Sequence, residues 1–190
     1  NDQWNVDVIS DEYAIGRSVV VDSKDRPHTA FFRNDSVFYA HKNGSWQVER
    51  LDDMKENTDV VISIDSNDVP HLLYKDNNYR LIYAYYDESW VFETLVEDSG
   101  PQQGVRIEID KNDKPHIFYS YADESNTEGN NLYVNYLYKE DGTWYNETVC
   151  YGGEGDFALD SSNKPHICFG LCKADTGSEQ CELIRYSYRC

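Results

Sequence analysis

The sequence predicts an all-β protein, a four-bladed β-propeller in which each blade is a four-stranded antiparallel meander. Two observations predict this fold. A short stretch, DSKDRPHTAFF in its first copy, recurs four times along the chain, with its histidines 43, 45 and 50 residues apart. The composition also favours strands, because aromatic residues make up 14% of the 190 residues and no window carries apolar residues at helical spacing. A strand-rich unit that recurs at roughly 40 to 50 residues is typical of propeller blades.

Each repeat centres on a turn with the pattern Asp, two residues, Asp or Asn, one residue, Pro, His. The four copies run from Asp22 to His28, from Asp65 to His71, from Asp110 to His116 and from Asp160 to His166. The first aspartate ends a strand, where its carboxylate can accept hydrogen bonds from turn amides, and the histidine opens the next strand. We expect structural roles for all eight residues, with no bound metal and no cofactor. Four imidazoles around one axis could face one ion, but a histidine beside a turn more often hydrogen-bonds its own turn or the next blade. The aspartates do not match a calcium-binding loop, because such a loop needs glycine where DKNDKP has proline.

Hairpin signals divide the chain, a single domain over residues 1–190, into four units. Alternating strands are separated by turns such as NDS, NGS, DES and EDGT, which are the residue types that join antiparallel strands. We expect blade 1 at about residues 16–52, blade 2 at 58–97, blade 3 at 103–150 and blade 4 at 155–190. The third unit carries an insertion, DESNTEGNN, between its second and third strands.

The fourth unit stops after its third strand, and residues 4–9 match the strand that it lacks. The segment WNVDVI aligns with WQVERL, WVFETL and WYNETV. We therefore expect Trp4, Val6 and Val8 to complete the last blade, because an unpaired edge strand invites aggregation. The segment could do this in its own chain and close a ring, or in a neighbouring chain and link molecules head to tail. The sequence leaves both arrangements open.

The repeat resembles a known group of extracellular β-propeller repeats. Its turn, D-x-x-D-x-P-H, is followed by aromatic-x-x-x-x-G-S-W, and this combination resembles the repeats of Asp-box, or sialidase-like, and lectin-like propellers. The resemblance covers nearly the entire chain and implies the propeller fold. The repeats lack the S-x-D-x-G-x-T-W box of the sialidase type, so the resemblance does not imply that the chain cleaves sugars.

A tryptophan begins each outer strand, and two roles fit it. The three are Trp46, Trp90 and Trp144. Exposed indoles at repeated positions could stack on sugar rings, as the resemblance to lectin-like propellers implies. They could also cover the gap between neighbouring blades, which a large aromatic side chain does well. We favour packing, because the tryptophan recurs even in the displaced segment at residues 4–9.

The charge of the chain excludes two classes of partner. Its 35 acidic residues outnumber 17 basic ones, for a net charge of −18. Such a surface repels phosphate backbones and anionic lipid, so nucleic acid and membrane surfaces are poor partners. No apolar run approaches the length needed for membrane insertion.

Several features favour an extracellular or cell-surface location. N-glycosylation sequons begin at Asn34, Asn43 and Asn146. All five cysteines lie in the last quarter of the chain, and Cys172 and Cys181 bracket the polar loop KADTGSEQ, which makes them the predicted disulfide. The chain begins at Asn1 rather than at a methionine, and we expect a processed product.

No catalytic motif is present in the sequence. We therefore expect a non-catalytic extracellular module with a structural or assembly role, which associates with itself or with another extracellular protein. The alternative is a carbohydrate-binding, lectin-like propeller. A glycoside hydrolase of the sialidase-like type is the least favoured reading, because it needs a pair of carboxylates in one pocket and the sequence nominates none.

Overall fold

The computed structural model describes residues 3–54, 59–100, 104–122, 132–153, 155–172 and 181–189, and within these residues all of the regular secondary structure is β-strand. The predicted all-β class is therefore confirmed. The same residues contain no helix of the length and apolar character that a membrane span requires.

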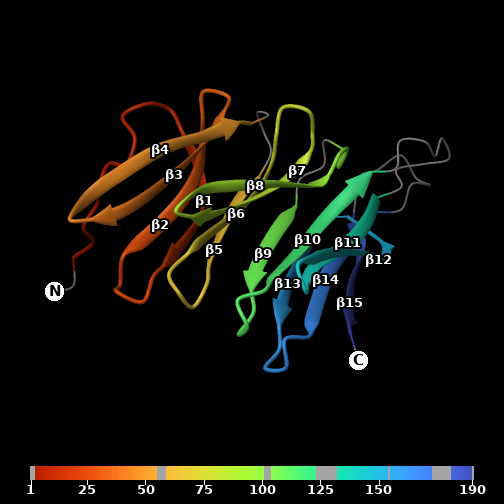
Figure 1. Cartoon of the computed structure of the whole chain (residues 1–190). Coiled ribbons are helices and arrows are strands. Elements are labelled where there is room, and N and C mark those ends of the chain that lie inside the picture. Colours follow the sequence, from red (N-terminus) through yellow and green to blue (C-terminus); the bar gives the residue numbers. More distant parts are fainter. Residues whose placement is uncertain are drawn as a thin grey trace.

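The strands form four separate antiparallel sheets in chain order (Figure 1). The first contains β1 (Ile15–Val21), β2 (Pro27–Arg33), β3 (Ser36–Asn43) and β4 (Ser45–Asp53). The second contains β5 (Val60–Ile64), β6 (Pro70–Lys75), β7 (Leu81–Asp87) and β8 (Ser89–Val96). The third contains β9 (Val105–Ile109), β10 (Pro115–Ala122), β11 (Leu132–Glu140) and β12 (Thr143–Tyr151). The fourth contains only β13 (Gly155–Leu159), β14 (Pro165–Cys172) and β15 (Cys181–Tyr188).

The repeated turn joins the first and second strands of every sheet. In the second sheet, Asp65 Oδ1 accepts hydrogen bonds from the amides of Asn67 and Val69, each at 2.8 Å. Asp68, the third residue after Asp65, has a φ of 64°, and the matching residues Asp25, Asp113 and Asn163 have φ of 58°, 59° and 61°. Asp and Asn tolerate this left-handed conformation better than most residues, which explains why only these two types occupy the position.

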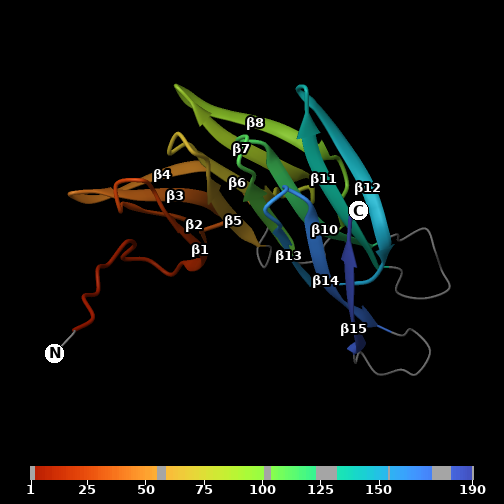
Figure 2. The same ribbon diagram turned by 90° about the horizontal axis from the view of Figure 1, so that it is seen from below.

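The four sheets stack face to face in an open row. The first strands of the sheets follow one another along the row, because β1 packs against β5, β5 against β9 and β9 against β13. The first and fourth sheets lie at the opposite ends (Figures 1 and 2). Each junction between neighbouring sheets buries one apolar cluster. Representative fully buried members are Leu72 at the first junction, Ile117 at the second and Phe118 at the third. The sheets therefore have the meander topology of propeller blades, without ring closure.

One of the two arrangements that the sequence leaves open, completion of the last blade by residues 4–9 of the same chain, is not present in the structure. These residues form no strand, and the fourth sheet ends at β15. The segment instead lies at the first sheet, where the Asp7 carboxylate accepts hydrogen bonds from Lys42 at 2.5 Å and from Trp46 at 3.3 Å. Because the first and fourth sheets are the two ends of the row, a segment held at one end cannot pair with the other (Figure 2). The arrangement in which a neighbouring chain receives the segment stays a prediction.

Candidate functional site at the two ends of the row

A repeated contact between a tryptophan and an acid links the outer strands of neighbouring sheets. Trp90 of β8 donates its indole N–H to Glu49 Oε2 of β4 at 3.1 Å, and Trp144 of β12 donates to Glu93 Oε2 of β8 at 2.7 Å. Each acid stands three residues after the tryptophan of its own strand. Since an odd separation puts two side chains on opposite faces of a strand, the tryptophan contacts the preceding sheet and the acid contacts the following one.

The same tryptophans pack on a tyrosine of the preceding sheet. Trp90 meets Tyr39 edge-on with ring centroids 5.1 Å apart, and Trp144 meets Tyr83 in the same way at 5.2 Å. The hydroxyl of each tyrosine is hydrogen-bonded to Nδ1 of a repeat histidine, His28 for Tyr39 and His71 for Tyr83, at 2.6 Å. Burial raises the pKa of both tyrosines above the ordinary value. The phenol therefore stays neutral and forms a fixed wall for the incoming indole.

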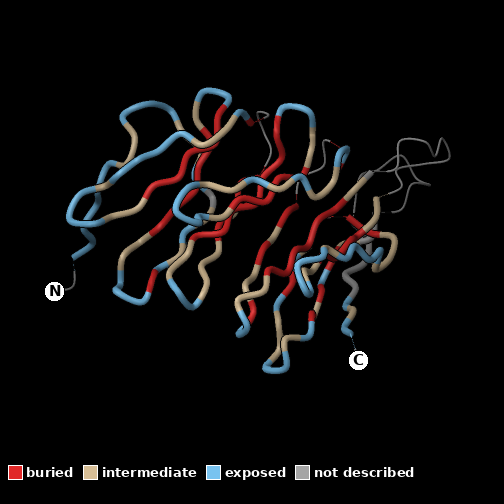
Figure 3. The backbone as a smooth tube through the Cα atoms, in the orientation of Figure 1, coloured by how far each residue is buried: buried red, intermediate tan, exposed pale blue. Residues whose placement is uncertain are grey.

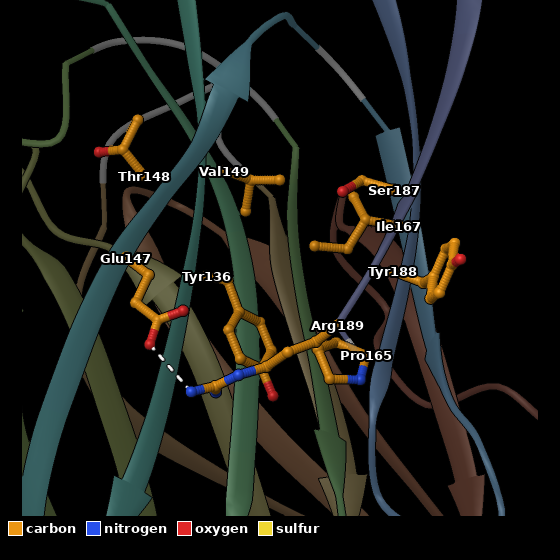
Figure 4. Close-up of a pocket in the computed structure, with 9 residues that line it drawn as sticks. All are labelled: Tyr136, Glu147, Thr148, Val149, Pro165, Ile167, Ser187, Tyr188 and Arg189. Carbon is orange, nitrogen blue, oxygen red and sulfur yellow. Dashed lines mark ion pairs between the residues drawn. The ribbon is translucent and has the colours of Figure 1, made fainter.

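The outer edge of the third sheet has the acid of this contact but no tryptophan to meet it. Glu147 of β12 occupies the position of Glu49 and Glu93, and Tyr136 occupies the position of Tyr39 and Tyr83, because both belong to the same cross-strand pair. Beside them lies a hollow of about 160 Å³, whose lining includes Ile167 of β14 (Figure 4). Arg189 reaches across its mouth to Glu147, with N–O at 3.2 Å. We call this hollow the tryptophan socket, because Tyr136 and Glu147 occupy the positions that contact an indole at the other junctions. Within the part of the chain that the structure describes, no outer strand of the fourth sheet fills it.

A cation supports the acid at three of the four equivalent places. Lys42 pairs with Asp7 at 2.5 Å, Lys139 pairs with Glu93 at 2.7 Å, and Arg189 pairs with Glu147. Lys42 and Lys139 are the direct cross-strand neighbours of Trp46 and Trp144. Arg189, directly after β15, has the position of these two lysines. A tryptophan on a fourth strand would therefore be the cross-strand neighbour of Arg189. The socket has every part of the repeated contact except the indole.

The outward face of the first sheet is open only in part. Ile9, Ala14 and Trp46 pack on its buried residues Phe31, Phe38 and Ala40, but the part of the face around Val19 is uncovered. The residue just before the cross-strand partner of each repeat histidine is Val19, Ile62, Ile107 or Phe157. Ile62, Ile107 and Phe157 face the preceding sheet and are 4%, 8% and 6% exposed, whereas Val19 is 65% exposed. An apolar residue at a position that is buried in the other three sheets indicates that another sheet packs there.

The outward face of the fourth sheet has the matching exposure. Tyr39, Tyr83 and Tyr136 are 7%, 3% and 2% exposed, but their equivalent in β15, Tyr186, is 62% exposed. The hydroxyl of Tyr186 is still hydrogen-bonded to His166, as in the other repeats. Cys168 and Phe118 each follow the repeat histidine of their own strand by two residues. Cys168 is exposed, whereas Phe118 is fully buried. Each end of the row therefore exposes a residue, Val19 at one end and Tyr186 at the other, whose equivalents in the inner sheets are buried.

The N-terminal segment has the side chains of an outer strand and no sheet to join. Trp4, Val6 and Val8 alternate along residues 4–8 and are 94%, 88% and 77% exposed. The tube next to the N-terminus is coloured as exposed (Figure 3). Asp7 already occupies the position of the acid, since it accepts the indole N–H of Trp46 as Glu49 accepts that of Trp90. The hydrogen bond from Lys42 holds the pKa of the Asp7 carboxyl below its usual value, so the acid is ionised near neutral pH.

The repeat residues predicted from the sequence lie in four separate groups, one in each sheet. Each histidine places Nδ1 at a tyrosine hydroxyl and Nε2 within 3.7 Å of the aspartate of its own turn. The structure thus places the four histidines apart rather than around one ion. In the described part of the chain, no group of three or more His, Cys, Asp or Glu side chains is placed to hold a metal.

The other predicted sites divide between described and undescribed residues. The sequon residues are all exposed; Asn34 and Asn43 lie in or next to turns, and Asn146 of β12 donates to the Tyr119 hydroxyl at 2.9 Å. Cys172 and Cys181 are opposite each other in the register of β14 and β15, but their side chains lie outside the described set, so the disulfide stays a prediction. The insertion in the third unit, the loop at residues 173–180 and Cys190 also lie outside the described residues.

Sequence reasoning missed two sets of functional residues. It missed the acid three residues after each tryptophan, Asp7, Glu49, Glu93 and Glu147, and it missed the tyrosine bonded to each histidine. The signal for the first set was present, because the spacing W-x-x-[DE] holds at all four tryptophans. The second set required the strand register, since the separation between His and Tyr varies from 11 to 20 residues.

Comparisons with known proteins add little to this geometry. No protein-family model matches the chain, and no curated protein matches it. Among solved structures, a fucose lectin from Kordia zhangzhouensis, in complex with methyl-fucoside, is similar at 14% identity and a TM-score of 0.47. The match covers 73% of this chain and 99% of the lectin. A likeness at this level carries no argument about what the chain binds.

Proposed function

We propose that the protein is a non-catalytic, extracellular assembly module whose N-terminal segment completes the fourth sheet of a neighbouring copy. The tryptophan socket beside Glu147 carries this proposal. The other outer strands fill the equivalent place with an indole, and the chain has one unplaced tryptophan, Trp4, in a segment of matching sequence. Addition of a strand to an exposed sheet edge is a common mode of protein association.

The register of the donated strand follows from the other sheets. Lys42 pairs with Trp46, and Tyr39 pairs with Glu49. Transferred to β15, the same register pairs Arg189 with Trp4 and Tyr186 with Asp7 of the incoming strand. Trp4 then enters the socket and donates to Glu147, while Asp7 remains in place for Trp46 and Lys42 of its own chain. Both sets of contacts are satisfied at once.

A neighbouring copy suits these contacts better than the same chain. The first and fourth sheets are at opposite ends of an open row (Figure 2), so each molecule offers a donor segment at one end and an acceptor edge at the other. Such head-to-tail contacts are heterologous and build an extended row of sheets when they do not close. The unpaired edge of β15 is covered by this pairing at every junction except the last.

Deletion of residues 1–10 tests the proposal. We expect the full-length chain to form extended assemblies in light scattering and electron microscopy. The deletion variant should stay monomeric and folded, with a somewhat lower thermal stability because the first sheet loses its contacts with Asp7 and Ile9. A peptide of residues 1–10 should bind the deletion variant in calorimetry, whereas the same peptide with Trp4→Ala should bind much more weakly. Assemblies that persist after the deletion, or a full-length chain that stays monomeric at all concentrations, would refute strand donation.

Carbohydrate binding is the second candidate, because it was the alternative role for the outer-strand tryptophans. The structure places Trp46, Trp90 and Trp144 half-buried, with each indole N–H donated to a carboxylate. Trp90 and Trp144 pack at junctions between sheets, and Trp46 contacts the N-terminal segment, so none of the three rings is an open surface for stacking. A glycan array with the wild-type chain tests the remaining surface, and a selective signal that survives deletion of residues 1–10 would support a separate sugar site.

A glycoside hydrolase has less support from the geometry. In the hollow beside Glu147 the lining contains one carboxylate, and Arg189 pairs with it. A second hollow, of about 330 Å³, is lined by Asp7 and Glu12. Lys42 holds Asp7, and the amide of Asn34 donates to Glu12 at 2.8 Å. Glycoside cleavage needs two carboxyl groups in one pocket, one as the acid and one as the base or nucleophile. Neither hollow presents two unpaired carboxylates.

A further inference from the structure

Neighbouring sheets are also joined through their repeated turns, at a place separate from the outer strands. At the first junction, the amide and hydroxyl of Ser23 donate to the Asp68 carboxylate at 2.8 and 2.7 Å. At the second, the amide and hydroxyl of Ser66 donate to the Asp113 carboxylate, both at 2.8 Å. The serine directly follows the first aspartate of its turn, and the acceptor is the third residue after the first aspartate of the next turn.

The third junction uses different groups. Lys111 stands in the serine position and Asn163 in the acceptor position. Lys111 Nζ donates to the Ser161 carbonyl at 2.6 Å, and Asn163 Nδ2 donates to Asp110 Oδ2 at 2.8 Å. Three junctions between four turns leave one serine position and one acceptor position without a neighbouring turn in the same chain.

The two remaining residues lie at opposite ends of the row. Ser161 has the serine position in the turn of the fourth sheet, and Asp25 has the acceptor position in the turn of the first sheet. Both are exposed. Within the described residues, the Ser161 amide and hydroxyl donate to no acceptor, and the Asp25 carboxylate accepts no hydrogen bond. The φ of Asp25 is 58°, close to the 64° of Asp68 and the 59° of Asp113, so its side chain leaves the turn in the same direction.

We propose that successive copies also meet turn to turn, with the amide and hydroxyl of Ser161 in one copy donating to the Asp25 carboxylate of the next. This contact rests on the proposed assembly but uses none of the residues of strand donation. It repeats between copies the contact that joins the first two junctions within the chain. The partner surface is therefore a second copy of this chain, recognised by a carboxylate that accepts two hydrogen bonds from one serine.

Val19 supports the same contact. In the second sheet, Ile62 contributes to the cluster buried against the first sheet, and the turn contact of Ser23 with Asp68 lies at the end of that junction. Val19 has the register position of Ile62 in the first sheet but is exposed. Docking of Asp25 onto Ser161 would bring the strand that carries Val19 against the fourth sheet of the preceding copy, where it would lose water contact.

A charge-swap experiment on the full-length chain tests the contact. Asp25→Lys removes the acceptor, and Ser161→Asp opposes two carboxylates, so each single variant should raise the dissociation constant about tenfold in sedimentation velocity, as expected for loss of charge-assisted hydrogen bonds. The double variant places a lysine opposite an aspartate and should recover most of the wild-type affinity. Asp35→Lys carries the same charge change in an exposed turn of the first sheet and should leave the constant unchanged.

The outcomes separate this contact from strand donation. Single variants that assemble like the wild type, or losses that simply add in the double variant, would overturn the turn contact. If those variants overturn the turn contact but deletion of residues 1–10 abolishes assembly, strand donation is supported and the turn contact is not. If the deletion variant still associates and Asp25→Lys breaks that association, the turn contact stands and strand donation is refuted.

Discussion

The strongest test of the tryptophan socket is Trp4→Ala in the full-length chain. Trp4 is 94% exposed in the single chain, whereas its equivalents in the outer strands are half-buried. Donation should therefore bury on the order of 100 Å² of apolar surface on the indole, which contributes about 2.5 kcal/mol. The hydrogen bond to Glu147 adds about 1 kcal/mol. After the ordering of the indole side chain is subtracted, the loss should be about 3 kcal/mol, or about a hundredfold in the dissociation constant.

Sedimentation velocity over a range of protein concentrations measures this loss. Trp4→Phe keeps a ring for the socket but has no N–H for Glu147, so it should fall between the wild type and Trp4→Ala. Tyr13→Ala is the matched control, because Tyr13 is an exposed aromatic residue of the same segment outside the donated strand. Equal assembly of Trp4→Ala and the wild type would refute the socket, and so would an equal loss in Tyr13→Ala.

Three further predictions concern the acid, the turns and the histidines. Glu147→Gln should weaken assembly about tenfold by removing the charge that receives the indole, while Glu140→Gln, an exposed acid at the end of β11, should not; equal affinities for both would contradict the role of Glu147. Asp65→Ala should lower the free energy of unfolding by about 2 kcal/mol, because two turn amides lose their acceptor, and Asp65→Asn, which keeps an acceptor oxygen, should lose less in thermal unfolding. Burial lowers the pKa of His71 below the ordinary histidine value of about 6.5, so below that pH the unfolded chain binds a proton that the folded chain does not, and stability should fall as the pH falls. In 0.5 M NaCl, added to screen the net charge, this slope should be steeper in the wild type than in His71→Gln, and equal slopes would contradict the assignment.

The repeat predicted the sheets because the residues that determine the turns and hairpins of each sheet lie within a single unit. In every unit a carboxylate such as Asp65 caps the turn between the first two strands, and a short Asn, Asp or Gly turn makes the next hairpin. These are local interactions between residues close in sequence, so four copies of the motif predict four meanders. The sheet topology is accordingly the part of the structure that the sequence predicted best.

Ring closure was not predictable, because it depends on angles between sheets rather than on strands. The angle at each junction follows from the packing of side chains such as Leu72, Ile117 and Phe118, and these differ from one junction to the next. No sequence motif encodes such an angle. The match of residues 4–9 to an outer strand predicted which strand is missing from the fourth sheet, but it contained no information about which molecule supplies it.

The open row itself favours a second copy as the acceptor. To bring β1 against β13 within one chain, the sheets would have to rotate at all three junctions, where side chains such as Leu72 and Phe118 have no exposed surface. Such interiors are close-packed and do not deform without loss of contacts. The proposed association of two copies would change none of these junctions, because the residues that it would bury, Val19 and Tyr186, are exposed at the ends. Closing a ring would therefore lose packing contacts at three junctions. Joining two chains would lose only the translational freedom of one molecule and the conformational freedom of one short segment.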